Sequence, residues 1–175
     1  IFFETTEGRI YRIDPLTEEV ELSATSFSTL KTLYFDGEFL WGISNTSLLK
    51  ISADTLSILQ TIPVTDSGAA HHRNLIADGG YLWITNGTAQ SISKISRSSG
   101  VVLYTFPLGF DVSFISILSN GFLAVSTTTD RVLLVNPLLG TVVGSITSIT
   151  SGQVIEDSSG NLYIPNGSAD TLSVY

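Results

Sequence analysis

The residues of this chain that could do chemistry gather in one stretch, residues 65–73, with the sequence TDSGAAHHR. It contains both histidines of the protein, His71 and His72, followed by Arg73. Histidine can ligate a metal or transfer a proton near neutral pH. Adjacent residues of a strand point to opposite faces, and no metal-ligand spacing surrounds this pair. The alternative is a polar loop between two strands, and we predict no metal site and no cofactor.

An enzyme built on this chain would need an acid beside these histidines. Glu156 is the best placed, because it ends a predicted strand and is followed by Asp157. No Gly-x-Ser-x-Gly elbow and no Gly-Lys-Ser/Thr phosphate loop occurs, and cysteine is absent. We therefore predict no catalytic residue, and keep His71, His72 and Glu156 as the set that an enzyme would use.

Three N-glycosylation sequons form a further pattern. They are Asn45-Thr46-Ser47, Asn86-Gly87-Thr88 and Asn166-Gly167-Ser168, and each follows a predicted strand at the same place in a repeat. The alternative is structural, because Asn-Gly suits a tight hairpin turn. Asn45, Asn86 and Asn166 are the candidate glycan acceptors.

The elements that position these residues form an internal repeat. One strand recurs from residues 1, 40, 82, 123 and 162, and the copies are 39 to 42 residues apart. It reads IFFET, LWGISN, LWITN, LAVST and LYIPN. A period of about 40 residues with several short strands in each unit is typical of a β-propeller.

The other strands of each unit follow the same rhythm. The next strand reads apolar, variable, often basic, apolar and small polar, as in Ile92-Ser93-Lys94-Ile95-Ser96. We place the inner strands at 32–35, 74–77, 114–118 and 153–156, and the outer strands at 19–23, 57–64, 101–108 and 141–146. The fold class is therefore all-β, a propeller of about five four-stranded blades in one domain. Its units are 1–25, 27–64, 71–108, 112–147 and 152–175.

The two terminal units are each one strand short in this alignment. The first lacks an inner strand and the last lacks an outer strand, so their exposed edges could associate. These assembly edges consist of Ile1, Phe2, Phe3, Leu172, Val174 and Tyr175. Either the chain is part of a larger propeller, or its ends pair with something else.

Two tryptophans, Trp41 and Trp83, occupy equivalent places in the repeat. Exposed aromatic side chains of this kind would bind sugars in a lectin. The alternative is that they fill the space between neighbouring blades, which needs large side chains.

The segments Tyr81–Asn86 with Ser91–Ser96, and Leu162–Asn166 with Thr171–Val174, carry a family resemblance. They resemble the YVTN-type (Tyr-Val-Thr-Asn) β-propeller repeat, and the resemblance covers essentially the whole chain. It implies a propeller fold and an extracellular or cell-surface setting. Thr127 replaces the asparagine in the fourth unit, so that blade departs from the pattern.

The composition of the chain excludes some classes of binding partner. The chain has 16 acidic and 8 basic residues, a net charge of −8, and no basic patch, so we expect neither nucleic acid nor anionic membrane as a partner. No apolar run approaches the roughly 20 residues that span a bilayer. The chain begins at Ile1 without a methionine, and we expect a leader to have been removed.

We predict from these patterns a non-catalytic, secreted or surface-exposed scaffold or recognition module. Its partners would be other copies of itself, other surface proteins, or glycans. The incomplete ends predict head-to-tail self-assembly, since strand addition at a sheet edge joins chains. The alternative is a propeller enzyme of the metal-dependent lyase or lactone hydrolase type, with its site in a central channel.

Overall fold

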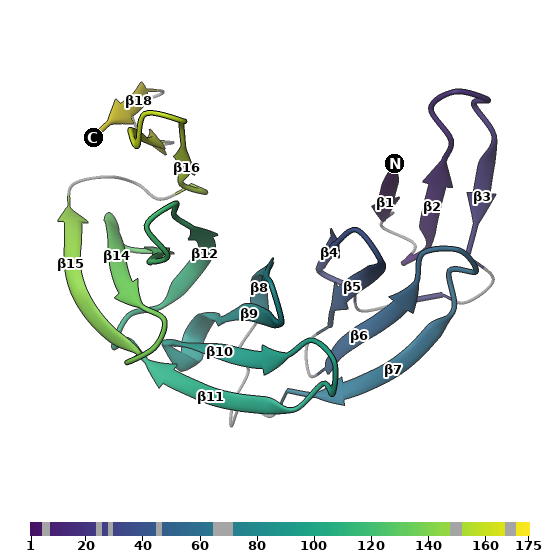
Figure 1. Ribbon diagram of the computed structural model, residues 1–175, viewed down its shortest axis with the longest axis horizontal. Coiled ribbons are helices and arrows are strands. Elements are labelled where there is room, and N and C mark those ends of the chain that lie inside the picture. The colour runs from purple at the N-terminus through teal and green to yellow at the C-terminus, as the bar shows by residue number, and fades with distance from the viewer. Residues whose placement is uncertain are drawn as a thin grey trace. The chain divides into compact units, whose positions relative to one another are not determined.

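The computed structural model describes residues 1–4, 8–23, 26–27, 30–44, 47–64, 72–147, 152–166 and 171–175. At residues 4, 72, 73, 88 and 166 it describes the backbone alone. The described chain consists of antiparallel strands and one short 3-10 helix (Figure 1). No helix in the described part of the chain combines the length and apolarity needed to cross a bilayer.

The chain divides into two compact units, and the first is Ile1–Thr65. Its first sheet has three strands in the order β1-β2-β3. Its second sheet has four strands in the order β4-β5-β6-β7. The strands are β1 (Phe2–Glu4), β2 (Ile10–Ile13), β3 (Val20–Leu22), β4 (Thr32–Phe35), β5 (Phe39–Ile43), β6 (Ser47–Ser52) and β7 (Ile58–Pro63).

The second unit, Asp66–Tyr175, holds three sheets. Two have four strands, β8-β9-β10-β11 and β12-β13-β14-β15, and the last has three, β16-β17-β18. The first of them comprises β8 (His72–Asp78), β9 (Tyr81–Asn86), β10 (Ser91–Ser96) and β11 (Val102–Pro107), with the 3-10 helix η1 (Gly87–Ala89). The others comprise β12 (Val112–Ile117), β13 (Leu123–Thr127), β14 (Arg131–Asn136), β15 (Thr141–Thr147), β16 (Ile155–Glu156), β17 (Leu162–Asn166) and β18 (Thr171–Val174).

Each complete sheet has a β-bulge between its third and fourth strands. The register shifts at Lys50/Ile51, Lys94/Ile95 and Leu134/Val135, which are equivalent positions of the repeat. A bulge of this kind bends the strand and strengthens its twist. The same bulge in three sheets indicates that the three complete copies of the repeat share one geometry at this position.

The cores lie between the faces of neighbouring sheets within each unit. In the first unit, Ile10, Leu40, Ile51 and Leu56 are buried together. In the second unit, one cluster joins the β8–β11 and β12–β15 sheets, and another joins β12–β15 to β16–β18. In β13, Leu123 and Val125 reach one cluster and Ala124 reaches the other, because successive side chains of a strand point to opposite faces.

The sheets lie within the five residue ranges expected from the repeat. The expected inner strand at 153–156 is shorter than predicted, because only Ile155 and Glu156 pair with β17. Val154 still contributes to the core, at 3% exposure, without belonging to a strand. That the five sheets form one domain stays a prediction.

Candidate functional site

The inner edge of β1 is the first candidate surface. Ile1 and Ile13 exchange two hydrogen bonds, with the Ile13 amide donating at 2.8 Å and the Ile1 amine donating at 2.9 Å. Because bonded pairs alternate along an antiparallel ladder, the main-chain groups of Phe2 and Glu4 point away from β2. No strand in the described part of the chain pairs with this edge.

Two hollows flank this edge within the first unit. An apolar hollow of about 250 Å³ is lined by Ile1, Phe2, Leu33, Phe35 and Leu40. The rings of Phe2 and Phe35 lie 5.1 Å apart, centre to centre, beside it. A second hollow of about 430 Å³ extends over the β2–β3 hairpin and includes Arg12. The edge of β1 therefore offers both main-chain groups and space for side chains.

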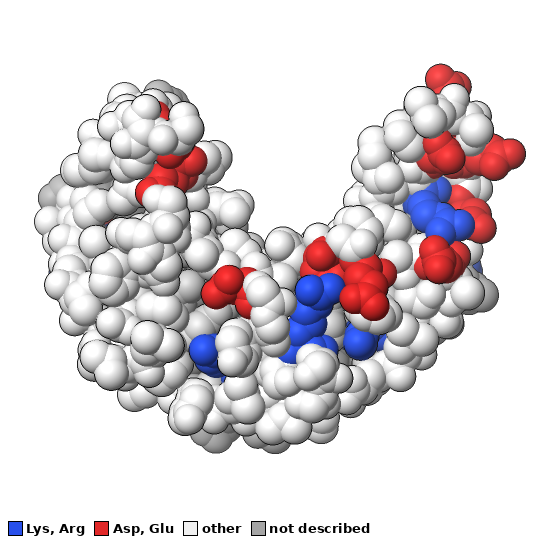
Figure 2. Space-filling view, in the orientation of Figure 1, with Lys and Arg blue, Asp and Glu red and all other residues white. Residues whose placement is uncertain are grey.

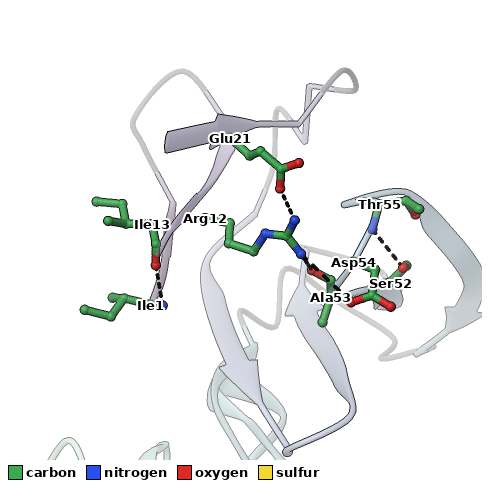
Figure 3. A network of polar contacts seen from close by, with 8 residues as sticks. All are labelled: Ile1, Arg12, Ile13, Glu21, Ser52, Ala53, Asp54 and Thr55. Atoms are coloured by element: carbon green, nitrogen blue, oxygen red, sulfur yellow. Dashed lines mark hydrogen bonds and ion pairs between the residues drawn. The ribbon is translucent and has the colours of Figure 1, made fainter. Parts of the chain in front are cut away.

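Arg12 fixes the position of β2 in this region (Figure 3). Its guanidinium forms an ion pair with Glu21 and donates to the Ala53 carbonyl at 2.9 Å. A carboxylate oxygen of Asp54 lies 3.9 Å away. Over the β1–β3 sheet, acidic side chains lie beside basic ones (Figure 2). Arg12 thus ties the first sheet to the turn after β6, and it is a structural group here.

The outer edge of β18 is the second candidate surface. Tyr175 and Leu162 exchange hydrogen bonds of 3.0 and 2.9 Å, so the main-chain groups of Leu172 and Val174 point away from β17. These two residues are 57% and 55% exposed. The described residues provide no fourth strand for this sheet, whereas β7, β11 and β15 occupy that place in the complete sheets.

The residues predicted for an enzyme are not gathered by the part of the chain that the structure describes. His71 lies outside the described residues, and His72 and Arg73 are described by their backbone in β8 alone. The Glu156 carboxylate accepts hydrogen bonds from the Ser119 amide at 2.6 Å and the Ser119 hydroxyl at 2.8 Å. Glu156 therefore clamps β16 to the neighbouring sheet. Among the described residues, no three acidic, histidine or cysteine side chains converge on a point where a metal could bind.

The structure describes the asparagine side chain of one of the three sequons. Asn45 lies outside the described residues, and for Asn166 only the backbone is described. Asn86 is 2% exposed, and its Nδ2 donates to the hydroxyls of Ser91 at 3.0 Å and Ser93 at 2.9 Å. Both amide protons are used, so this arrangement disfavours Asn86 as a glycan acceptor in the folded chain. The turn after it is a 3-10 helix rather than a two-residue hairpin.

The two tryptophans support the packing alternative. Trp41 and Trp83 are 0% and 1% exposed. The Trp41 indole donates to the Asp36 carboxylate at 2.5 Å. Lys50 and Lys94 lie at equivalent positions, and each ammonium group lies over an aromatic ring, Phe39 at 3.7 Å and Tyr81 at 3.9 Å. Trp83 packs in the cluster that joins its own sheet to the β12–β15 sheet, so the two buried tryptophans are not a sugar-binding platform.

Buried hydroxyl groups form a polar seam between the sheets of the second unit, which is not among the sites predicted from the sequence. The buried Thr85 hydroxyl accepts from the Asn74 amide at 3.0 Å and lies 3.3 Å from the Ser113 carbonyl, to which it can donate. Ser126, at the equivalent position in the next unit, donates to the Gly152 carbonyl at 2.6 Å. The recurrence of a hydroxyl at this position was the signal that could have revealed it.

The pKa of Asp157 is lowered well below its ordinary value. The side-chain amide and then the backbone amide of Asn161 donate to it, and together with Ser159 and Tyr163 they lower its pKa to about 2. The same contact raises the pKa of Tyr163. These bonds shape the turn before β17, and the carboxylate is held in place rather than left available for proton transfer.

Comparisons with known proteins identify the fold. No protein-family model matches the chain, and no curated protein sequence matches it. Among solved structures, it resembles a streptogramin B lyase with a TM-score of 0.78 at 13% identity, over 97% of this chain and 62% of that one. It resembles virginiamycin B lyase from Staphylococcus aureus with a TM-score of 0.74 at 12% identity, over 99% and 68%. It resembles the WD40 β-propeller domain of Doa1 with a TM-score of 0.69 at 16% identity, over 97% of this chain and 61% of that one.

These likenesses show that the chain has a β-propeller fold, as predicted. At identities of 12 to 16% they carry the fold alone. The chain spans about three fifths of the length of the streptogramin B lyase and Doa1 structures that it matches. The narrower resemblance to YVTN-type repeats stays a prediction.

Proposed function

We propose that this chain is a non-catalytic, secreted or cell-surface β-propeller scaffold that recognises other polypeptides, first of all other copies of itself, at the edges of its terminal sheets. The observation that carries this proposal is the contrast between three complete sheets and two three-stranded ones. In the complete sheets an inner strand and an outer strand flank the two middle strands, and no described residue takes the inner place beside β1 or the outer place beside β18.

The composition of the two open strands supports association. Natural edge strands that avoid pairing are very short or carry charged side chains, proline or a bulge. β18 reads TLSV and has no charge or proline, whereas β1 reads FFE, has three residues and ends in an acid. Ile1, Phe3, Leu172 and Val174 are 39 to 68% exposed. Apolar strands with unpaired main-chain groups are the usual receptors for strand addition.

The net charge predicts how association depends on salt. At −8, two copies repel each other at long range, while strand pairing acts at contact. Salt screens the repulsion over about 8 Å at physiological ionic strength. Association should therefore strengthen as sodium chloride is raised, opposite to the behaviour of a complex held by ion pairs.

Sedimentation velocity of the purified chain, over rising protein and salt concentration, tests the proposal. We expect species at multiples of 18.8 kDa that grow with both variables. A chain that stays monomeric at every concentration would refute self-assembly. The intact mass of protein from its natural source tests the extracellular assignment, since sugar-sized additions require passage through a glycosylation pathway.

A second candidate is an enzyme, favoured by the fold similarity to the two lyases. The test is to measure bound divalent metal by elemental analysis and the consumption of streptogramin B by mass spectrometry. We expect no consumption by the chain. Consumption that disappears in His72→Ala would establish the enzyme instead.

A further inference from the structure

An apolar patch lies on the outer side of the second unit, where the β8–β11 sheet meets the β12–β15 sheet. A Cβ atom added at Gly140 would overlap the Phe106 ring, so the turn between β14 and β15 lies directly beside β11 (Figure 1). The Phe106 ring is in turn stacked on Tyr104, with 5.8 Å between the ring centres. These contacts join exposed residues of β11, the turn and β15 into one surface, which we call the outer patch. It consists of Tyr104, Leu138, Leu139, Val142 and Val143.

The outer patch is large enough to form a stable contact. Leu138, Leu139 and Tyr104 are 82%, 70% and 62% exposed, and Val142 and Val143 are 44% and 54% exposed. With an accessible area on the order of 200 Å² for each large apolar residue, these fractions give roughly 600 Å². The largest apolar patch of an ordinary monomer measures about 300–600 Å² and is often functional. Two such patches in contact would bury about 1,200 Å², which is the lower end of stable interfaces.

The segments that form the outer patch carry no charge. Residues 98–110 and 132–155 contain no acidic or basic residue, although the chain has 16 acidic and 8 basic residues. Lys94 opposes Tyr104 in the β10–β11 ladder, but its ammonium group lies over the Tyr81 ring at 3.9 Å. A charged partner surface would lose its hydration at the outer patch without gaining an opposite charge. The charge pattern therefore favours a partner surface that is itself uncharged and apolar.

A second copy of the chain offers such a surface. At a net charge of −8, two copies repel each other, and contact between their outer patches brings together segments without charge. The patch also has two parts of different shape. Leu138 and Leu139 lie in a hairpin turn closed by the hydrogen bond from Gly140 to Asn136, whereas Tyr104 lies on a strand. A two-fold axis can place the turn of each copy on the strand of the other, so that one surface serves both copies.

From these observations we infer that two copies of this chain form a closed dimer through the outer patch, with Leu139 of each copy against Tyr104 of the other. The inference goes beyond the proposed function, because the outer patch belongs to two complete sheets and includes no residue of the terminal sheets. A two-fold contact ends at two copies, whereas a head-to-tail contact between different surfaces continues from copy to copy. The two kinds of association are therefore distinguishable by the size of the species they form.

The substitution Leu139→Asp places a charge in the contact, and sedimentation velocity measures its effect. We expect the unmodified chain to form a dimer of twice 18.8 kDa, and Leu139→Asp to weaken dimerisation about tenfold or more, because the contact would bury an unpaired carboxylate. Leu16→Asp is the matched control, since Leu16 follows Pro15 in the equivalent turn of the first sheet and is also exposed. Near-ultraviolet circular dichroism verifies that each variant is folded. An equal loss in both variants would overturn the inference.

A second variant, Tyr104→Lys, tests which residues face each other. Alone it should also fail to dimerise, because its ammonium group would be buried against Leu139 of the partner copy. In a mixture with Leu139→Asp, the introduced ammonium group faces the introduced carboxylate across the two-fold axis, while the other half of the contact is unchanged. We expect dimers to reappear in the mixture. Two variants that stay monomeric when they are mixed would overturn the pairing of Leu139 with Tyr104.

The remaining outcomes separate this dimer from association at the terminal sheets. Species that continue beyond the dimer and are unchanged by Leu139→Asp would overturn the contact at the outer patch and leave the proposed function standing. A chain that stays monomeric at every concentration would overturn both. If that monomer sediments with phosphatidylcholine vesicles, and Leu139→Asp abolishes this binding, the outer patch meets a lipid surface instead of a second copy.

Discussion

The hydroxyl of Thr85 provides the sharpest test of how neighbouring sheets are held together. Thr85 is fully buried, and its Oγ1 accepts the Asn74 amide at 3.0 Å while lying 3.3 Å from the Ser113 carbonyl of the next sheet. Thr85→Val replaces the hydroxyl by a methyl group of nearly the same shape. The substitution therefore opens no cavity and isolates the hydrogen bonds.

The expected loss follows from what the valine leaves behind. The Asn74 amide loses its acceptor at a bulge, where the ladder to β9 is already interrupted. A buried donor left without a partner costs about 1–3 kcal/mol. With a urea dependence of about 2 kcal/mol per molar, a loss of 2 kcal/mol lowers the unfolding midpoint by about 1 M.

The two tryptophans make the assay specific to a unit. Trp41 belongs to the first unit and Trp83 to the second, which contains Thr85. In a Trp41→Phe background, fluorescence during urea unfolding reports the second unit alone. Thr141→Val is the matched control, because Thr141 is an exposed residue of β15 in the same unit.

An equal free energy of unfolding for Thr85→Val and Thr141→Val would refute the role assigned to the Thr85 hydroxyl. Exposed substitutions usually change the free energy of unfolding by less than about 0.5 kcal/mol. If the free energies of unfolding of Thr85→Val and Thr141→Val differ by less than about 0.5 kcal/mol, the hydroxyl of Thr85 does not stabilise the contact between the sheets. A midpoint shift with an unchanged slope would support it, since the folded and unfolded states would keep their exposed areas.

Two further predictions concern turns. The pKa of Asp157 is lowered from 3.8 to about 2, so its contribution to stability is present above pH 3.8 and is lost as the pH falls toward 2. Asp157→Asn should remove that part of the acid dependence of the melting temperature, and an unchanged acid profile would contradict the assigned contacts. Gly140 has φ +65°, and an added Cβ would overlap the Phe106 ring, whereas Gly121 at φ +82° has open space around it. Gly140→Ala should therefore lower the free energy of unfolding by about 1–3 kcal/mol more than Gly121→Ala, measured by urea unfolding. Equal losses would show that the ring moves aside without cost.

The repeat made most strands predictable. The strand expected at 82–86 is found at Tyr81–Asn86, and the outer strand expected at 101–108 is found at Val102–Pro107. Alternation and turn residues are local signals, and five copies reinforce each other. The burial of Trp41 and Trp83 agrees with the packing alternative for the same reason, because equivalent places in a repeat meet equivalent surroundings.

The contacts between sheets could not be predicted in this way. Glu156 binds Ser119 from 37 residues away, and nothing near either residue indicates the pairing. The burial of Asn86 depends on two serines of the following strand, while the sequon pattern is read from three residues alone. Such contacts depend on how the sheets stack, which a periodic pattern along the chain does not contain.

The seam between the sheets has a consequence for how such a chain could have arisen. Thr85, Ser116 and Ser126 all lie close enough to donate to main-chain carbonyls of the following repeat unit, at 3.3, 2.7 and 2.6 Å, rather than to its side chains. A carbonyl is present whatever residue occupies the position. A duplicated or transplanted blade would therefore find its hydrogen-bond acceptors in any neighbour of the same backbone geometry. Gene duplication could therefore lengthen or shorten such an array without substitutions at the acceptor positions, provided that the donor hydroxyls are kept.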